Sequence, residues 1–305
     1  MQPGSLSAWF WATRPWTLLT SGGAGLAGMG CAVYDGYFSL PRFVMAIVGA
    51  MIFQAGTNLI NDYYDWKSGV DTFDLLSPEA YGPSLAIQRE LLTPDQVWWG
   101  GIACFAAGSV LGLILTYLCG WPILLIGVLA ILCGYFYTAT PISLAYIALG
   151  DIASFLFLGP AVSLGTYYAI ARKFAASAAI ASLPAGALSS GILQVNNIRD
   201  IERDPIHGKR TLASRVGREG AIRQLLVYES MAYTAILCGV LAGALPWLCL
   251  IAFASLRHVV RQIRILTREQ SAPELNVAMM ESGQAHIETC ALLTIALIIS
   301  AALGR

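Results

Sequence analysis

Nine apolar stretches run through the chain, and each is close to the ~20 residues that an α-helix needs to cross a bilayer. Hydrophobic residues make up 57% of the sequence and charged residues only 12%, whereas soluble proteins carry about 25% charged residues. The runs do not alternate as barrel strands do. The sequence therefore predicts an all-α, polytopic membrane protein with about nine transmembrane helices. The expected spans centre on residues 16–33, 42–60, 99–119, 122–139, 145–170, 175–195, 222–244, 247–265 and 286–303.

Lysine and arginine are distributed unequally over the loops between these spans. Of the 18 residues, fourteen lie in the N-terminal segment and in the loops that follow even-numbered spans, and four lie on the other face. Cytoplasmic loops carry the excess of lysine and arginine in membrane proteins. We therefore expect the N-terminus and the even-to-odd loops in the cytoplasm, the C-terminus on the opposite side, and a location in the cell (plasma) membrane.

Cysteine and histidine indicate neither a disulfide framework nor a zinc site. The seven cysteines are scattered singly through apolar segments, with no CxxC pair, and the three histidines share no ligand spacing. We expect the cysteines to be packing residues and assign no metal to the histidines.

A first polar cluster, NLINDYYDWKSGVD at 58–71, ends the second span. Helical spacing puts Asn58, one of Asn61 and Asp62, and Asp65 on one face. Asp71 follows a glycine, so the chain must turn back to bring it to the others.

A second polar cluster ends the sixth span, within residues 191–217. Asn196, Asp200 and Asp204 are spaced by four, which predicts that all three project from one helical face; Asn197 lies beside them. Both clusters end an even-numbered span on the same membrane face, and each precedes a polar loop and two more spans. This pattern predicts a pseudo-repeat that brings the two Asp-rich motifs face to face.

Oxygen ligands from two facing helices are typical of Mg²⁺, which takes one or two carboxylates together with substrate phosphate oxygens. Basic residues that a diphosphate would need are close in sequence: Lys67, Arg203, Lys209 and Arg210. Either cluster alone could cap a helix or pair with arginine at the headgroup level. Two matched clusters beside basic residues favour a metal-bridged diphosphate site.

The motifs NxxNDxxDxxxGxD at 58–71 and NNxRDxxxDxxxGKRTLAxxxG at 196–217 resemble those of the UbiA superfamily of intramembrane prenyltransferases. The likeness is closest to the branch that prenylates 1,4-dihydroxy-2-naphthoate in menaquinone biosynthesis. It continues through RPWTLL at 14–19, GPSLAIQRELLT at 82–93, YTATPISLAYIALGD at 137–151 and GPAVSLGTYY at 159–168.

The resemblance implies a single transmembrane prenyltransferase domain over residues 1–305, with helices around a central cavity. The loops 61–97 and 197–221 would cap it on the cytoplasmic side. It implies a polyprenyl diphosphate donor, an aromatic acceptor and Mg²⁺ as cofactor. We expect no nucleic-acid partner, because membrane orientation and diphosphate binding account for the basic loop 199–223.

The resemblance and the residue pattern together assign roles to individual residues. Asp62, Asp65, Asp200 and Asp204 would be the catalytic acids, within the metal–diphosphate set of Asn58, Asn61, Asp62, Asp65, Asp71, Asn196, Asn197, Asp200 and Asp204. The diphosphate-binding cations would be Lys67, Arg89, Arg203, Lys209 and Arg210. Arg14, Tyr137 and Asp151 would line the acceptor end of the cavity, although Tyr137 could merely pack and Asp151 could merely complement a helix dipole.

Two positions depart from the family pattern, which leads us to expect a basic residue where Leu85 stands and a glycine where Glu90 stands. The change could shift diphosphate binding to Arg89 or Lys67, or it could signal another substrate. A different aromatic acceptor and a membrane terpene cyclase therefore stay open. A divalent-cation transporter is a more distant alternative, because it predicts acids near mid-span rather than at one membrane face.

Overall fold

The computed structural model describes residues 1–70, 84–269 and 271–304. The described part of the chain is helical and contains no strand, so the all-α prediction is confirmed. The 3₁₀ helices are labelled η. The elements are α1 (Leu6–Ala12), α2 (Pro15–Tyr34), α3 (Leu40–Ser68), α4 (Pro94–Cys119), α5 (Trp121–Phe136), η1 (Leu144–Ile147), α6 (Gly150–Leu158), α7 (Pro160–Ala171), α8 (Ala176–Arg199), η2 (Asp204–His207), α9 (Leu212–Leu241), η3 (Trp247–Ser255), α10 (Leu256–Arg268) and α11 (Ala272–Ala302).

Six helical segments within the described residues are long and apolar enough to cross a membrane, judged by length and composition alone. They are α3, α4, α6 with α7, α8, α9 and α11. The other three expected spans fall on α2, on α5 with only 16 residues, and on η3 followed by α10. The expected count of nine is therefore not confirmed.

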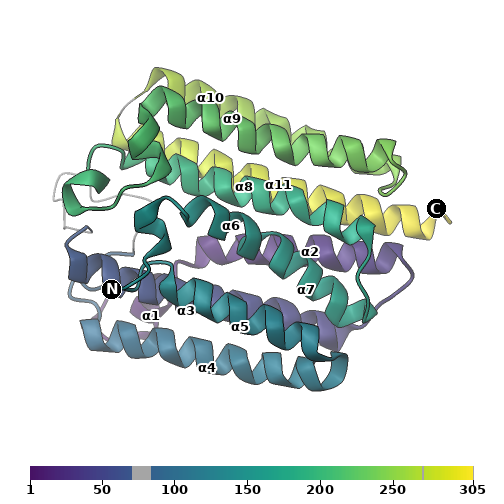
Figure 1. Cartoon of the computed structure of the whole chain (residues 1–305), viewed down its shortest axis with the longest axis horizontal. Helices are drawn as coiled ribbons and strands as arrows, with labels where there is room; N and C mark the ends of the chain where they lie inside the picture. The colour runs from purple at the N-terminus through teal and green to yellow at the C-terminus, as the bar shows by residue number, and fades with distance from the viewer. Residues whose placement is uncertain (71–83, 270, 305) are drawn as a thin grey trace.

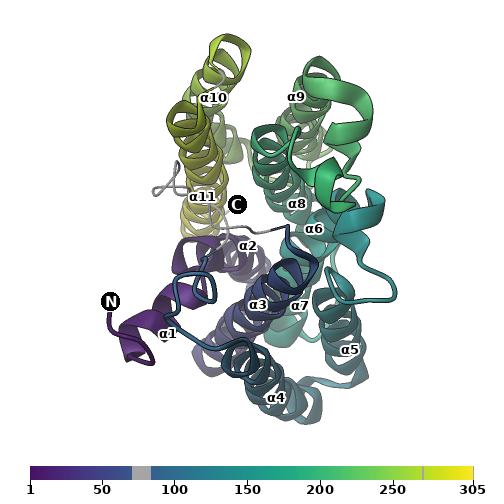
Figure 2. The same cartoon turned by 90° about the vertical axis from the view of Figure 1, so that its left-hand side faces the viewer.

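The long helices lie side by side along the longest axis of the molecule, with the C-terminus at one end (Figure 1). Seen from the other end, α10 and α11 stand on one side and α8 and α9 on the other (Figure 2). Helices α3, α4 and α5 form the lower part of this view, next to α2 and α7.

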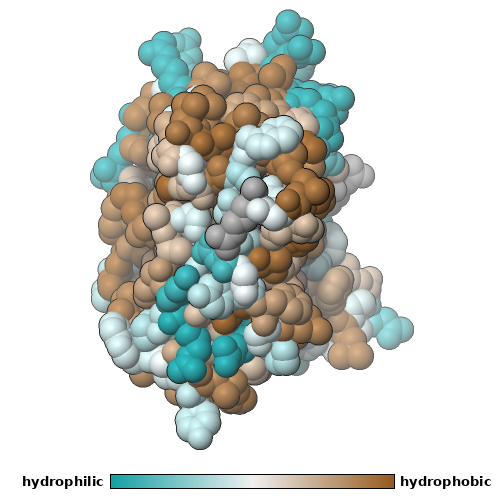
Figure 3. Space-filling model, turned by 90° about the vertical axis from the view of Figure 1, so that its right-hand side faces the viewer, coloured by the Kyte–Doolittle hydropathy of each residue, from teal (hydrophilic) through white to brown (hydrophobic). Residues whose placement is uncertain are grey.

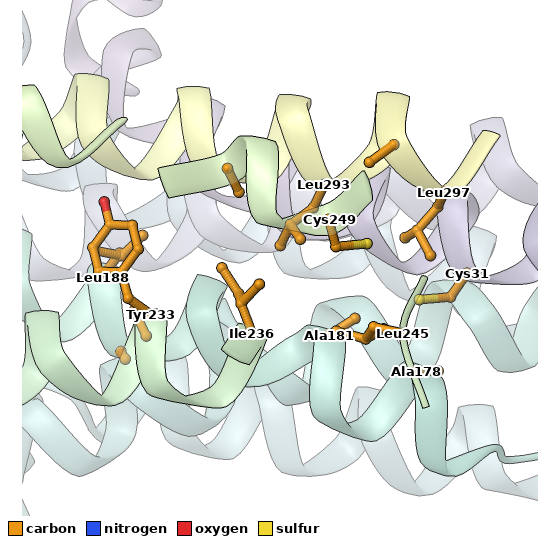
Figure 4. Packing of buried hydrophobic residues seen from close by; sticks show 14 of the residues in the cluster. Cys31, Ala178, Ala181, Leu188, Tyr233, Ile236, Leu245, Cys249, Leu293 and Leu297 are labelled. Carbon is orange, nitrogen blue, oxygen red and sulfur yellow. The ribbon is translucent and has the colours of Figure 1, made fainter. Parts of the chain in front are cut away.

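Small residues let the helices approach closely. A Cβ atom at Gly28 of α2 would collide with the main-chain carbonyl of Ser163 in α7, and the Ser163 hydroxyl donates a 2.7 Å hydrogen bond to the carbonyl of Ala24. In the adjoining core, Cys31, Ala178 and Ala181 pack with larger residues such as Leu188 and Leu293 (Figure 4). Membrane helices depend on such close packing, because lipid is as apolar as their side chains.

The expected helix over 145–170 is broken at Gly159, and Pro160 begins α7. A Cβ atom at Gly159 would collide with the main chain of Gly186 in α8. The break therefore accompanies the close approach of α8, and it leaves α6 as a separate helix of 9 residues.

The outer faces of the helices expose large apolar side chains, including Leu113 and Tyr117 on α4. At the end that carries the C-terminus, hydrophobic and hydrophilic residues are interspersed (Figure 3). Exposed aromatic residues near that end include Phe38 before α3, Trp121 at the start of α5 and Trp247 at the start of η3. Aromatic residues of this kind are enriched where a protein meets the membrane–water interface. The outer surface is that of a multi-pass membrane protein.

Candidate functional site

One cavity of about 900 Å³ lies between the helices and is lined by residues of α2 to α8 and α11. Most of its wall is apolar, with side chains such as Leu115, Ile123 and Phe157. The polar residues near the ends of α3 and α8 that line it are Arg14, Asn58, Asn61, Asp65, Asn196, Asn197, Arg199, Asp200, Arg203, Asp204 and Lys209. Both polar clusters therefore line a single cavity, as the sequence predicts.

The first cluster is helical, because α3 continues to Ser68. Asn58, Asn61 and Asp65 line the cavity from one face of this helix. The Asn58 amide donates 2.9 Å hydrogen bonds to the carbonyl of Thr13 and to the hydroxyl of its near neighbour Thr17. These bonds fix the start of α2 against α3. They use only the amide nitrogen of Asn58, not its oxygen.

Asp65 is buried, and neighbouring groups hold both of its oxygens. The Asn61 amide donates to Oδ2 over 2.8 Å, and the Tyr146 hydroxyl donates to Oδ1 over 2.8 Å. The same hydroxyl lies 2.8 Å from the Ser68 hydroxyl. These bonds to neutral donors orient the carboxylate toward the cavity that Asp65 lines.

Asp62 is 4% exposed, and it is not among the described residues that line the cavity. Its Oδ1 accepts a hydrogen bond from Arg14 within an ion pair, and its Oδ2 accepts one from the Ser84 hydroxyl. A buried carboxylate needs such partners, because an unpaired charge in the interior is costly. Asp62 thus ties the start of α2 and the segment at Ser84 to α3.

The second cluster is not one continuous helical face, because α8 ends at Arg199 and Asp200 caps it. The expectation that Asn196, Asp200 and Asp204 share one helical face is therefore wrong. The Arg199 guanidinium donates to both Asp200 oxygens, over 2.9 and 2.7 Å, and to the Asn196 oxygen over 2.9 Å. Burial raises the pKa of Asp200, but the charge and hydrogen bonds of Arg199, together with the charges of Lys209 and Arg203, hold the pKa below its usual value.

Asp204 begins η2 and is buried. Its Oδ1 lies 3.3 Å from the Lys209 ammonium, and its Oδ2 has no hydrogen-bond partner among the described residues. Burial raises the pKa of Asp204 to about 6; the charge of Lys209 opposes the shift, and the charges of Asp200 and Asp65 add to it. Because the charge of Asp65 affects the pKa of Asp204, the two clusters are close enough to interact electrostatically.

The predicted cations divide into two groups. Arg203 and Lys209 line the cavity. Lys67 is exposed at the end of α3, with its ammonium 5.8 Å from the ring centre of Tyr63. The described residues Lys67, Arg89 and Arg210 are not among those that line the cavity, and Asp71 lies outside the described part of the chain.

Tyr137 and Asp151, the remaining predicted cavity residues, line its wall. Tyr137 ends α5 and Asp151 lies in the first turn of α6. Asp151 is 4% exposed, and its Oδ1 has no hydrogen-bond partner among the described residues. The prediction that both residues lie at the cavity therefore agrees with the structure.

The two unusual positions both have left-handed backbone conformations. Leu85, with φ of 53°, lines the cavity, and Glu90, with φ of 55°, is exposed. A left-handed conformation is strained for residues other than glycine, which gives a physical reason to expect glycine at position 90.

Sequence reasoning gave no site role to Tyr146 or Arg199, which hold Asp65 and Asp200. Arg199 could have been found from the sequence, since it directly precedes Asp200. Tyr146 carries no such signal, because it lies 81 positions from Asp65.

Comparison with known proteins adds sequence and fold relatives. The profile described as the UbiA prenyltransferase family matches residues 15–283. The chain is 31% identical over 289 residues to the 1,4-dihydroxy-2-naphthoate octaprenyltransferase of Bacillus subtilis, covering 94% of this chain and 91% of the relative. It is 28% identical to the Mycobacterium tuberculosis protein of the same name, covering 93% of this chain and 94% of that protein.

Among solved structures, a UbiA homolog from Archaeoglobus fulgidus bound to GPP and Mg²⁺ superimposes with a TM-score of 0.66. The alignment covers 96% of this chain and 99% of the homolog at 16% sequence identity. At that identity the likeness concerns the fold alone.

Proposed function

The chain belongs to the UbiA prenyltransferase family, and we propose that it transfers a polyprenyl group from a polyprenyl diphosphate to 1,4-dihydroxy-2-naphthoate in menaquinone biosynthesis. It is a prenyltransferase with an aromatic acceptor, so family membership favours the enzyme over a divalent-cation transporter. The proposal of this particular acceptor rests on the names of its sequence relatives.

One observation carries the proposal: a single cavity is polar where the two motifs meet and apolar over the rest of its wall. A polyprenyl diphosphate has the same division, with a charged head and a long apolar tail. A tail too long for the cavity of about 900 Å³ would extend into lipid.

The residues present fit Mg²⁺. Asp204 offers a buried oxygen without a hydrogen-bond partner among the described residues, and Asp65 lines the same cavity. No group of three His, Cys, Asp or Glu side chains within the described residues is arranged to hold a metal ion. Mg²⁺ suits such a partial site, because it usually shares its coordination between one or two carboxylates, water and substrate phosphate. We propose that its ligands come from Asn58, Asn61, Asp65, Asp71, Asn196, Asn197, Asp200 and Asp204. Asp62 is left out of this set, because Arg14 and Ser84 hold both of its oxygens.

When bound, Mg²⁺ would neutralise charge on the departing diphosphate. The chain contributes in other ways. Arg203 and Lys209 line the same end of the cavity and would offset the remaining charge. The apolar wall would exclude water from the allylic cation, and the Tyr137 ring would face it from α5.

Four of the predicted site residues are not among the described residues that line the cavity, so their roles need a separate explanation. They are Asp62, Lys67, Arg89 and Arg210. Asp62 would act by fixing Arg14 at the cavity, since Arg14 lines it. The three cations would reach the diphosphate only if the loops 61–97 and 197–221 form the cap that we propose.

We further propose that residues 1–305 form one transmembrane domain in the plasma membrane, with the N-terminus and both acidic clusters on the cytoplasmic side. The fourteen-to-four distribution of lysine and arginine supports this orientation.

Leu85 supports a second candidate, because an apolar side chain lines the cavity where the family pattern led us to expect a basic one. The candidate is an enzyme of the same family with another aromatic acceptor, or a terpene cyclase that ionises the same donor.

Purified protein in detergent tests these candidates. It would be incubated with Mg²⁺ and geranylgeranyl or longer polyprenyl diphosphate, with and without 1,4-dihydroxy-2-naphthoate, and the organic extract analysed by mass spectrometry. A demethylmenaquinone-type product that is lost in Asp65→Ala and Asp200→Ala, but kept in the exposed control Asp95→Ala, is the expected result. A hydrocarbon or terpene alcohol without the acceptor would favour the cyclase, and no ionisation of any donor would refute both candidates.

A further inference from the structure

A second polar region lies in the cavity wall away from the acidic clusters. Asp151 at the start of α6 and Ser189 of α8 both line the cavity. The hydroxyl of Ser190 donates a 2.8 Å hydrogen bond to the main-chain carbonyl of Asp151, which fixes this part of α8 against α6. The two cavity-lining side chains therefore come from neighbouring stretches of contacting helices.

Both side chains are buried, and each has a polar atom without a hydrogen-bond partner among the described residues. Asp151 is 4% exposed and Ser189 is 2% exposed. Neither Asp151 Oδ1 nor Ser189 Oγ has a hydrogen-bond partner among the described residues. Burying a polar atom without a hydrogen bond is costly, and a carboxylate within a membrane-spanning segment generally serves a function. These atoms are thus available to a polar group of a molecule in the cavity.

Helix capping does not account for this carboxylate. Asp151 lies in the first turn of α6, where a negative charge complements the helix dipole. The carboxyl also accepts a hydrogen bond from its own main-chain amide. These interactions still leave Oδ1 without a partner among the described residues, and they do not explain the unpartnered hydroxyl of Ser189 in another helix.

We propose that Asp151 and Ser189 bind a hydroxyl of the aromatic acceptor, and that Asp151 takes up its proton during prenyl transfer. Ser189 is seven residues before Asn196 along α8, a rise of about 10 Å. A phenolic ring held there would lie on the far side of the allylic carbon from a diphosphate at the acidic clusters. The inference rests on the proposed function and identifies the acceptor end of the same cavity.

The chemistry balances without a further reactant. The allylic C–O bond breaks and its electron pair leaves with the diphosphate. A ring carbon ortho or para to the bound hydroxyl forms the new C–C bond, while the O–H pair becomes part of a ring C=O and the proton passes to Asp151. In an acceptor with a carboxylate on the attacked carbon, CO₂ leaves, its bonding pair restores the aromatic ring, and Asp151 returns the proton to the oxygen.

The test compares Asp151→Asn and Ser189→Ala with Glu229→Gln. Glu229 is a matched control, since it is 3% exposed within membrane-spanning α9 and is not among the described residues lining the cavity. Gel filtration and thermal unfolding in detergent would establish that each variant is folded. Each would be assayed with 1,4-dihydroxy-2-naphthoate and with its two monomethyl ethers, alongside direct binding of the donor diphosphate.

We expect Asp151→Asn to lower kcat by about 10²- to 10⁴-fold, the usual range for a general base. Donor binding should not change, because the diphosphate binds elsewhere. Ser189→Ala should raise the acceptor KM by about tenfold, as expected for one lost hydrogen bond, with little change in kcat. The unaltered enzyme should react more slowly with the ether that masks the bound hydroxyl than with the parent acceptor. Asp151→Asn should react with that ether and with the parent acceptor at similar rates.

An equal loss of rate in Asp151→Asn for the parent acceptor and both ethers would show a merely structural role and overturn the inference. So would weakened donor binding, or unchanged kcat. If the unaltered protein transferred a prenyl group to no aromatic acceptor, the proposed function would fail first and this inference with it.

Discussion

The Tyr146 hydroxyl donates a 2.8 Å hydrogen bond to Asp65 Oδ1. The main chain of the same tyrosine contacts the second motif, because its carbonyl accepts a 3.1 Å hydrogen bond from the amide of Arg210. One residue of η1 therefore touches both halves of the candidate site. This connection links the orientation of the Asp65 carboxylate to the position of the loop that carries Lys209.

Tyr146→Phe removes the hydroxyl while preserving the ring. We expect the KM for the donor diphosphate to rise about tenfold, because a hydrogen bond to a charged group contributes roughly 1.5–3 kcal/mol. Steady-state kinetics with varied donor and saturating acceptor would measure it. Tyr117→Phe is the control, since Tyr117 is 91% exposed on α4. An unchanged donor KM in Tyr146→Phe would show that the bond does not orient Asp65 for binding.

Asp65→Asn and Asp204→Asn each remove a carboxylate from the cavity without changing its shape. Each should lower the rate of prenyl transfer by at least ~10²-fold, the usual cost of losing a group that stabilises charge in the transition state. Calorimetric titration with Mg²⁺ and a diphosphate donor should show weaker binding as well. Asp95→Asn, on the exposed first turn of α4, should match the unaltered protein in both measurements. Full activity in either cavity variant would remove that residue from the site.

Asp204 makes the stability of the metal-free protein depend on pH. Its folded pKa is raised from 3.8 to about 6, chiefly by burial. The folded state binds this proton more tightly than the unfolded state, so ionisation costs stability as the pH rises through this window.

In EDTA, the Tm of Asp204→Asn should therefore rise above that of the unaltered protein as the pH increases from about 4 to about 6. The difference in Tm should stay constant above about pH 6 and disappear below about pH 4. The corresponding gain in the free energy of unfolding should not exceed roughly 2–3 kcal/mol. Thermal unfolding in detergent over this pH range would measure it, with Asp95→Asn as the control. A Tm difference that is the same at every pH would contradict the prediction.

Glu90→Gly should stabilise the fold by about 1 kcal/mol, because glycine adopts a left-handed conformation without strain. The side chain is exposed, so little packing is lost. Arg223→Gly is the opposite control, since it places glycine at an exposed position of α9 beyond the non-helical Gly217 and should destabilise by about 1 kcal/mol. Chemical denaturation in detergent would measure both, and a loss of stability in Glu90→Gly would refute the strain argument.

The sequence could predict features that depend on local spacing. Asn58 and Asp65 were expected on one helical face, and they line one cavity because α3 continues through them. The break at Gly159 was missed, although Gly159–Pro160 is a local signal that typically ends a helix. The close approach of Gly186 to this break is not revealed by any local pattern.

Partners distant in sequence explain the differences within the site. Asp62 was grouped with the other acids, but Arg14 and Ser84, 48 and 22 positions away, hold both of its oxygens. Helical spacing alone cannot distinguish a carboxylate that faces a cavity from one that ties two helices together. The helix through Asp200 was expected to continue, whereas the chain turns after Arg199.

The division of the acidic clusters between α3 and α8 has a consequence for biosynthesis. Asp65 leaves the ribosome about 130 residues before Asp200. At the usual rate of roughly 5–20 residues per second, the first cluster waits on the order of ten seconds for the second. A nascent chain that holds only one cluster would bind a diphosphate weakly at most. Prenyl donors in the membrane would thus be protected from premature ionisation until α8 has been inserted.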